Sequence, residues 1–288
     1  MKWLARQKRC RRGLFVAGLA AAVLAFGVIG STGILWGRAD ATPLPRPVVK
    51  ARAAVVTDRD TGAVLFSRKS SLRLPPASLT KVMTALLVVE HVRNLNSYVR
   101  VSSEAVGVRG AVLGLRVGDH ITVRNLLRGA LVKGATDCAI ALAHYVAGSE
   151  TAFVTMMNAK AEKLGMTHTY FVNSSGITVP GHYSSALDLA RLARAAMNNS
   201  RFRPFVATWR VRVRWTHHNL IVGSRNWLLR HYSWADGIKT GNTSAAGLCM
   251  IASGTYESRA LIVVTLHEPS VANEKADVLK LFRYGSTR

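Results

Sequence analysis

A serine and a lysine stand three positions apart in Ser78-Leu79-Thr80-Lys81. If this segment opens a helix, the Ser78 hydroxyl and the Lys81 amine share one face and come within hydrogen-bond reach. A serine hydroxyl becomes a nucleophile only when a base removes its proton. Lys81 can be that base if burial or a second cation lowers its pKa from the usual value of about 10.4. The pair indicates acyl transfer through a serine ester, although a helix cap beside a solvated lysine has the same spacing.

A second motif, Lys239-Thr240-Gly241, is followed by Asn242. A cation, a hydroxyl and a glycine on a strand suit a substrate carboxylate. Lys239 supplies charge, Thr240 supplies a hydrogen-bond donor, and Gly241 lets a ligand backbone approach closely. The alternative interpretation is a turn rich in small polar residues.

Together the two motifs are more specific than either alone. Their order, and a separation of about 160 residues, resemble the penicillin-recognising serine enzymes, in which S-x-x-K and K-T-G are two of three motifs. The resemblance is sharpest to the D-alanyl-D-alanine carboxypeptidases of the low-molecular-weight penicillin-binding group. It runs from about Lys50 to Tyr284, and the matching stretches are residues 75–84, 173–176, 181–184 and 236–247.

This resemblance implies a serine-type carboxypeptidase that trims the terminal D-alanine of peptidoglycan stem peptides. Ser78 would attack the carbonyl carbon between the two D-alanines, and Lys81 would take the proton. Lys239 and Thr240 would bind the terminal carboxylate. The backbone N–H groups of Ser78 and Asn242 would form the oxyanion hole. Water would release the acyl-enzyme, and β-lactams such as penicillin would acylate the same serine as covalent inhibitors.

The middle motif departs from the family pattern of Ser-x-Asn before an Asp. Here it reads Gly134-Ala135-Thr136, followed by Asp137. Gly134 has no hydroxyl to relay a proton, and Thr136 lacks the paired donor and acceptor of an amide. Thr136 is then either a catalytic substitute or an N-cap, and Lys133 is either a substitute cation or, as we prefer, solvated. We expect attenuated turnover, the alternative being a catalytically weak homologue that binds penicillin or wall peptide.

The pattern of apolar residues predicts the elements that must position these motifs. A helix is expected to open near Ser78, and Lys239 is expected on a strand. The predicted strands are 51–57, 63–67, 208–215, 237–240, 247–253 and 260–266, and the predicted helices are 123–132, 137–146, 151–164, 186–197 and 272–283. Strands at both ends with helices between them favour one domain of the α/β (α+β) class, and the resemblance implies a β-lactamase/transpeptidase-like fold: a mixed sheet covered by helices, with a helical subdomain.

The segment 1–41 has the order of an export signal. A basic run precedes an uncharged, mostly apolar stretch from Gly13 to Trp36, and Ala39-Asp40-Ala41 is a small-x-small cleavage site. The apolar stretch is also long enough to remain as a membrane anchor. Either way, the rest of the chain is expected outside the cytoplasm, at the cell membrane or secreted to the wall. The predicted organisation is a signal peptide or anchor at 1–41, a linker at 42–49, and a penicillin-recognising domain at 50–288.

The formal net charge is +24, and +18 remains once the segment 1–41 is set aside, because that segment holds seven of the 39 Lys+Arg and one of the 15 Asp+Glu. No nucleic-acid-binding signature accompanies this charge, and export makes nucleic acid a poor partner. Membrane headgroups, anionic wall polymers or plain solvation remain as explanations. The histidines show no metal-ligand spacing, so neither a metal nor another cofactor is expected.

A class A β-lactamase shares the two outer motifs but needs a carboxylate on a loop for deacylation. The acids between Cys138 and Ser200 are Glu150, Glu162 and Asp188, and all three fall at or within predicted helices. Penicillin hydrolysis is therefore not expected to be the main activity. Cys138 and Cys249 can form a disulfide outside the cytoplasm, but their small apolar surroundings favour two buried thiols.

Overall fold

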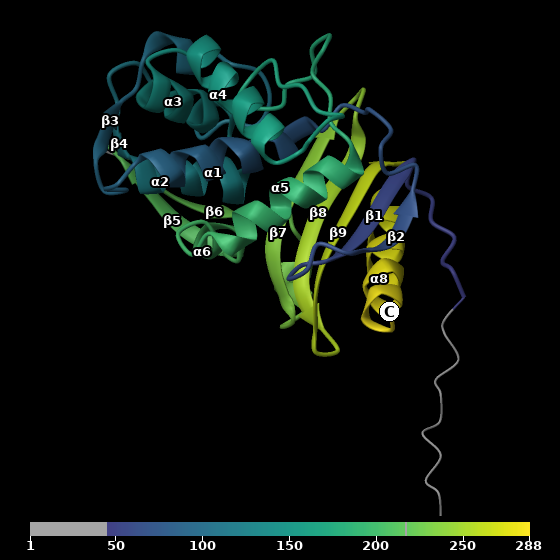
Figure 1. Ribbon diagram of the computed structural model, residues 1–288. Coiled ribbons are helices and arrows are strands. Elements are labelled where there is room, and N and C mark those ends of the chain that lie inside the picture. The colour runs from purple at the N-terminus through teal and green to yellow at the C-terminus, as the bar shows by residue number, and fades with distance from the viewer. Residues whose placement is uncertain (1–44, 217) are drawn as a thin grey trace, which may run out of the picture. The chain divides into compact units, whose positions relative to one another are not determined.

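The computed structural model describes residues 45–216 and 218–288, and its larger sheet has the strand order β2-β1-β9-β8-β7 (Figure 1). Every neighbouring pair in it is antiparallel. The first strand of the chain lies inside the sheet, beside the last strand, with Ala53 opposite Leu266. The strands are β1 (Ala53–Asp58), β2 (Val64–Arg68), β7 (Ala235–Thr243), β8 (Gly247–Tyr256) and β9 (Arg259–Glu268).

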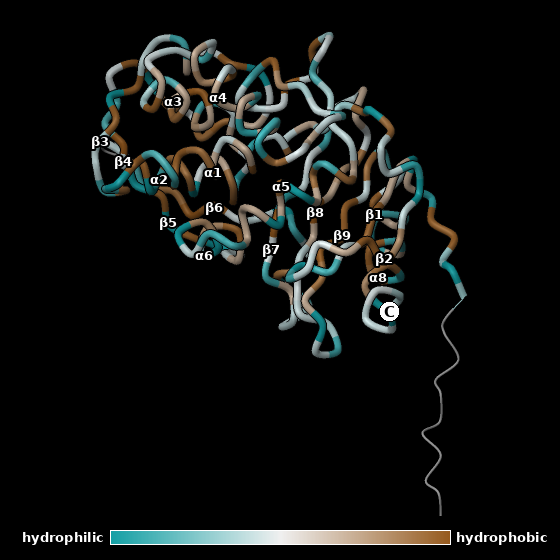
Figure 2. Tube along the Cα trace, in the orientation of Figure 1, coloured by the Kyte–Doolittle hydropathy of each residue, from teal (hydrophilic) through white to brown (hydrophobic). Residues whose placement is uncertain are grey.

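Helices cover both faces of this sheet, which explains why its central strands are almost continuously apolar. Successive side chains of a strand point to opposite faces. In β1, Val55 packs into the core on the side of α5 (Ala186–Asn198), whereas Val56 packs on the side of α8 (Val271–Ser286). The helices flank the sheet in Figure 1, and β9 is brown, the hydrophobic end of the scale, in Figure 2.

A helical subdomain packs beside this sheet. It contains α1 (Lys81–His91), α2 (Val123–Arg128), α3 (Thr136–Ala147) and α4 (Glu150–Lys163). The turn η3 (Gly129–Lys133) continues α2 as a single π-helical turn, and η1 (Ala77–Thr80) precedes α1 as a 3₁₀ turn. Further short elements are η2 (Ser103–Ala105), α6 (Arg203–Val206) and α7 (Leu228–His231).

A second antiparallel sheet has the order β3-β4-β5-β6. Its strands are β3 (Tyr98–Arg100), β4 (His120–Thr122), β5 (Arg210–Trp215) and β6 (His218–Gly223). Only β5 was expected from the sequence. Val99, Ile121 and Val213 point into the same core as α2, so one face of this sheet is buried and the other faces solvent.

The predicted fold class is confirmed: the chain has helices packed on sheets, with a helical subdomain. The strand directions differ from the expected mixed sheet, because all strand pairs in the described residues are antiparallel. The predicted signal peptide or anchor at 1–41 lies outside the described residues, as does the start of the 42–49 linker. In the part of the chain that the structure describes, no helix combines the length and apolar character needed to cross a bilayer.

Candidate active site

Ser78 and Lys81 are brought together as the spacing predicts. The Lys81 amine donates hydrogen bonds to Ser78 Oγ at 3.1 Å and to the Ser175 carbonyl oxygen at 2.6 Å. The local structure differs from the expected helix start, because Ser78 lies in the 3₁₀ turn η1 and α1 begins only at Lys81. Ala77 has a φ of 49°, a left-handed conformation that costs a non-glycine residue about 1 kcal/mol. Strain of this kind next to a candidate nucleophile is typical of functional sites.

Lys81 is 1% exposed, and its environment favours the neutral amine. Burial, followed by the positive charge of Lys239, lowers the pKa of Lys81 to about 7. A large fraction of the amine is therefore neutral near pH 7. In that form its nitrogen can accept the Ser78 proton along the 3.1 Å contact.

The turn at 173–176 fixes the carbonyl that contacts Lys81. The Asn173 side-chain oxygen accepts from the backbone N–H groups of Ser175 at 3.2 Å and Gly176 at 2.7 Å. A Cβ at Gly176 would lie 1.9 Å from the carbonyl oxygen of Ala77, so only glycine lets this turn pack against η1. Sequence reasoning found this stretch only through the family resemblance.

The K-T-G strand lies directly against the serine turn. A Cβ at Gly241 would lie 2.9 Å from the backbone nitrogen of Ser78. The space that we assigned to a ligand backbone is thus occupied by the Ser78 backbone itself. The Lys239 amine is buried and donates to the Thr240 carbonyl oxygen at 2.8 Å. Burial, and then the charge of Arg225, lower the pKa of Lys239 to about 8.

The middle motif reaches the same site from the start of α3. Gly134 has a φ of 82°, and a Cβ placed on it would lie 3.4 Å from Lys239 Nζ. Thr136 is buried and is the first residue of α3, whereas Ala135 holds the N-cap position, so the N-cap interpretation of Thr136 is wrong. Lys133 is half-buried and lines the cleft, where we had preferred a solvated side chain.

Asp137, the acid after the middle motif, ties one wall of the site to α3. Its carboxylate accepts from the backbone N–H groups of Leu113, Gly114 and Leu115 at 3.0, 2.8 and 3.2 Å. These three hydrogen bonds fix the loop that contributes Gly110 and Ala111 to the cleft. Sequence reasoning placed Asp137 at a helix start but did not identify this contact, which joins segments well separated along the chain.

Residues of all three motifs line one cleft of about 480 Å³, within the usual size range for a small-molecule site. It contains the candidate residues from three parts of the chain: Ser78, Lys81, Thr136, Lys239, Thr240, Gly241 and Asn242. Among the lining residues that sequence reasoning missed are four charged or aromatic ones: Arg225, Trp227, Glu274 and Lys275. No motif marks these four, because they enter the cleft from the loop after β6 and from the first turn of α8.

Comparison with known proteins gives the same assignment. The model of the peptidase S11 family, D-alanyl-D-alanine carboxypeptidase, matches residues 40–270. The chain belongs to this family. It is 35% identical over 240 residues to D-alanyl-D-alanine carboxypeptidase DacF of Bacillus subtilis, covering 82% of this chain and 62% of that protein. Across four curated relatives from Bacillus, Escherichia and Salmonella, the chain spans between 57% and 70% of their lengths.

Solved structures of this peptidase family agree in fold. The Streptomyces K15 DD-transpeptidase superposes with a TM-score of 0.80 at 29% identity, over 84% of this chain and 99% of that one. Penicillin binding protein 6B from Escherichia coli gives a TM-score of 0.77 at 34% identity, over 85% and 80% of the two chains.

In this S11 peptidase, two of the three acids between Cys138 and Ser200, where a β-lactamase would need a loop carboxylate, have structural contacts, and the third, Glu162, is exposed on α4 away from the cleft. Glu150 begins α4, and its carboxylate accepts from the backbone N–H and the hydroxyl of Ser174 at 2.8 and 2.5 Å. Thr84 Oγ1 donates to the carbonyl oxygen of the same Ser174 at 2.5 Å. Glu150 therefore supports the turn behind Lys81.

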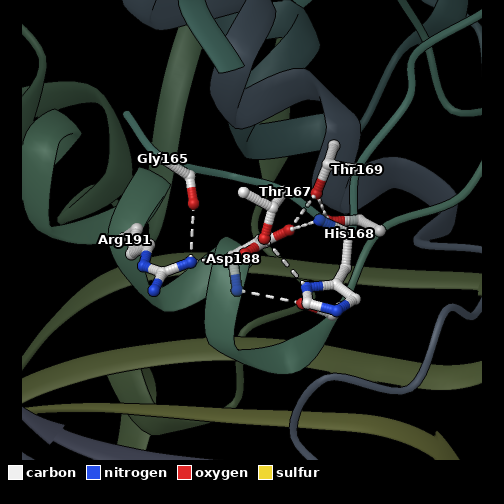
Figure 3. Close-up of polar contacts among 8 residues, drawn as sticks. Gly165, Thr167, His168, Thr169, Asp188 and Arg191 are labelled. Carbon is white, nitrogen blue, oxygen red and sulfur yellow. Dashed lines mark hydrogen bonds and ion pairs between the residues drawn. The ribbon is translucent and has the colours of Figure 1, made fainter. Parts of the chain in front are cut away.

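Asp188 is also committed to structure, as Figure 3 shows. One carboxylate oxygen accepts from the His168 backbone N–H at 2.7 Å and from the Thr169 hydroxyl at 2.9 Å. The other pairs with Arg191 at 2.9 Å, and Arg191 donates onward to the Gly165 carbonyl oxygen at 2.6 Å. This network joins α5 to the loop at 165–169, and none of its members lines the cleft.

The two cysteines of this domain are free and buried, as their surroundings favoured. Burial raises the pKa of the Cys249 thiol to about 12 and that of Cys138 well above its usual value. Both thiols are therefore protonated at neutral pH and act as small packing residues.

Proposed function

We propose that this chain is a serine-type D-Ala-D-Ala carboxypeptidase that removes the terminal D-alanine of peptidoglycan stem peptides through an acyl-enzyme on Ser78. The observation that carries the proposal is the contact of 3.1 Å between Ser78 Oγ and a buried Lys81 amine whose pKa is lowered to about 7. A nucleophile beside a neutral base, facing a buried cation, is the arrangement that acyl transfer from a carboxylate-bearing peptide requires.

We infer a step for each group in the cleft. As Ser78 Oγ bonds to the substrate carbonyl carbon, its proton passes to Lys81. The negative charge that develops on the carbonyl oxygen is met by the backbone N–H groups of Ser78 and Asn242, a contribution of a few kcal/mol per donor. Lys239 and Thr240 hold the terminal carboxylate throughout. When the C–N bond breaks, the amine of D-alanine takes up the proton, and water then hydrolyses the ester on Ser78.

Because position 134 lacks a hydroxyl, we expect the transfer of a proton to the leaving amine to be slow. The proton must travel from Lys81 to the leaving amine, and Gly134 offers no group to carry it. The nearest atom to a side chain at this position is Lys239 Nζ, at 3.4 Å from the Cβ site. We therefore expect acylation with weak turnover. A homologue that only binds penicillin or wall peptide remains the second candidate, favoured by the same loss.

Two measurements on the full chain separate these functions. Mass spectrometry after incubation with penicillin, with the adduct mapped to a peptide, tests whether Ser78 is acylated. Release of D-alanine from a synthetic peptide ending in D-Ala-D-Ala tests turnover. An adduct with D-alanine release supports the carboxypeptidase, an adduct without release supports the binding protein, and no adduct at Ser78 refutes both.

We predict that the double variant Gly134→Ser, Thr136→Asn raises kcat for D-alanine release at least tenfold. Restoring the relay should recover part of the 10²–10⁴-fold that general acid–base assistance provides. Carboxylate binding by Lys239 is untouched, so KM should change less than kcat. The φ of 82° at Gly134 sets a stability penalty of about 1 kcal/mol for any side chain there. The single variant Thr136→Asn is the control, and an unchanged or lower kcat in the stably folded double variant would contradict attenuation.

We predict a bell-shaped pH dependence of kcat/KM. Lys81 must be neutral to accept a proton, and its pKa is lowered to about 7, so the rate should rise as pH increases through 7. Lys239 must stay charged to hold a carboxylate, and its pKa is lowered to about 8, so the rate should fall above 8. The maximum is therefore expected between these values. The rate of D-alanine release, measured from pH 5 to 10, checks this prediction. A rate that rises steadily beyond pH 9 would show that Lys239 need not be charged.

Location and partners follow from the same proposal. The substrate, peptidoglycan stem peptide, lies outside the cytoplasm, and the segment 1–41 has the order of an export signal or anchor. We infer that the chain works on the outer side of the cell membrane or in the wall, attached through its N-terminal segment if that segment is retained.

A further inference from the structure

The strand β5 presents a row of arginines to solvent. Its sequence alternates strictly, so that Val213 and Trp215 are buried while Arg210, Arg212 and Arg214 are exposed on the opposite face. Same-face residues of a strand are about 7 Å apart. The three guanidinium groups therefore lie along one line on the outer face of the smaller sheet.

The neighbouring strands extend this basic face. Val99 of β3 is buried, so Tyr98 and Arg100 on either side of it point outward. On the other side, Ile221 of β6 stands directly opposite Arg212 and faces the same way. Tyr98 is 69% exposed and Ile221 is 51% exposed. We call these four arginines, Arg100, Arg210, Arg212 and Arg214, together with Tyr98 and Ile221, the arginine face.

The arginine face has no acidic residue on its own described strands to neutralise its charge. The described residues of β3, β4, β5 and β6 include no Asp or Glu. None of the four arginines takes part in an ion pair with any other described residue. Guanidinium groups on one sheet face, without an ion-pair partner, make a field that attracts an extended anion.

A hollow at one corner of this face has the chemistry of a phosphate pocket. It has a volume of about 420 Å³ and is lined by Arg210, Arg230, Trp209 and Ile221, among others. The Arg230 guanidinium lies 5.8 Å from the centre of the Trp209 ring. Two cations beside an indole and an aliphatic side chain can hold a phosphate group together with the apolar part of its ester.

We infer that the arginine face binds the surface of an anionic phospholipid bilayer. The charge of this face and the absence of acids from its described strands suit any polyanion. The exposed Tyr98 and Ile221 decide for the bilayer, because such side chains gain free energy in the interfacial region of a membrane and gain little from a hydrated polymer. Each arginine near an anionic surface gives roughly a fivefold gain in affinity. This inference does not depend on the catalytic activity proposed above.

The test compares the full chain with vesicles of phosphatidylcholine mixed with phosphatidylglycerol and with vesicles of phosphatidylcholine alone. Hydrogen exchange of the β5 and β6 amides reports contact at this face directly, whatever the segment 1–41 contributes to membrane attachment. We expect slower exchange in β5 and β6 with the anionic vesicles only, and loss of the effect at 0.5 M NaCl, where charges are screened within about 4 Å.

The variant Arg210→Ala, Arg212→Ala, Arg214→Ala should weaken this face's contribution to binding by about 100-fold and abolish the protection. The matched control, Arg52→Ala, Arg73→Ala, Arg283→Ala, removes the same number of charges from exposed positions elsewhere. This control should retain the protection of β5 and β6. Unchanged thermal melting would show that both variants fold. Protection that persists in the first variant, or that soluble polyphosphate produces as well as the vesicles do, would overturn the bilayer assignment.

Discussion

Replacing Ser78 by alanine should abolish both the penicillin adduct and the release of D-alanine. Ser78 Oγ is the atom that would carry the acyl group, so its removal leaves only binding and the oxyanion donors, and kcat should fall by about 10⁴-fold or more. The fold should survive. The Lys81 amine loses its 3.1 Å contact with Ser78 but keeps the 2.6 Å hydrogen bond to the Ser175 carbonyl oxygen.

The Ser78→Ala measurement is intact mass after penicillin treatment, beside thermal melting of the same sample. Binding of a D-Ala-D-Ala peptide to the variant is measured by calorimetry. Retained binding would show that Lys239 and Thr240 still hold the carboxylate. A penicillin adduct of unchanged stoichiometry in the variant would place the nucleophile elsewhere and refute the assignment.

Replacing Lys81 by arginine should slow acylation of Ser78 by at least 10³-fold. A guanidinium remains protonated at every accessible pH, so it cannot accept the serine proton. The wild-type amine can do so because its burial lowers its pKa to about 7. The loss of acylation should persist at pH 9. A base whose pKa was only moderately raised would be neutral at that pH, and acylation would recover.

Lys160→Arg is the matched control for Lys81→Arg. Lys160 pairs with Glu90 at 2.7 Å away from the cleft, and arginine can keep that pair, so acylation should be unchanged. The rate of penicillin acylation is measured for both variants, with melting temperature to detect destabilisation by a buried guanidinium. If the folded Lys81→Arg variant is acylated at the wild-type rate, Lys81 is not the general base.

The longer elements and the core of the site were predictable because both depend on short-range spacing. The i, i+3 pair of Ser78 and Lys81 meets in a 3₁₀ turn as it would in an α-helix, so the error in helix type did not affect the contact. The interior strands β1, β8 and β9 of the larger sheet appear as apolar runs because α5 and α8 cover both faces. Strand direction was not predictable from those runs, since parallel and antiparallel buried strands have similar composition.

The parts that were missed depend on long-range packing. Strands β3 and β4 have three residues each, too few to show a period. In β6 the apolar Leu220 and Ile221 are adjacent and both exposed, which breaks the expected alternation. Arg225 and Glu274 line the cleft together with residues of β7, although they come from the loop after β6 and from the first turn of α8. Their positions are set by contacts between distant segments that no local pattern records.

The position of β1 inside the sheet has a consequence for the order of folding. This strand lies between β2 and β9, and Ala53 is paired with Leu266, which comes from the last strand of the chain. Contacts between such distant positions require the closure of a long loop, which slows folding. During synthesis, the sheet that carries Lys239 cannot be completed until β9 has emerged. The helical subdomain has shorter-range contacts and can form earlier, so Ser78 and Lys239 should come together in one of the last steps of folding.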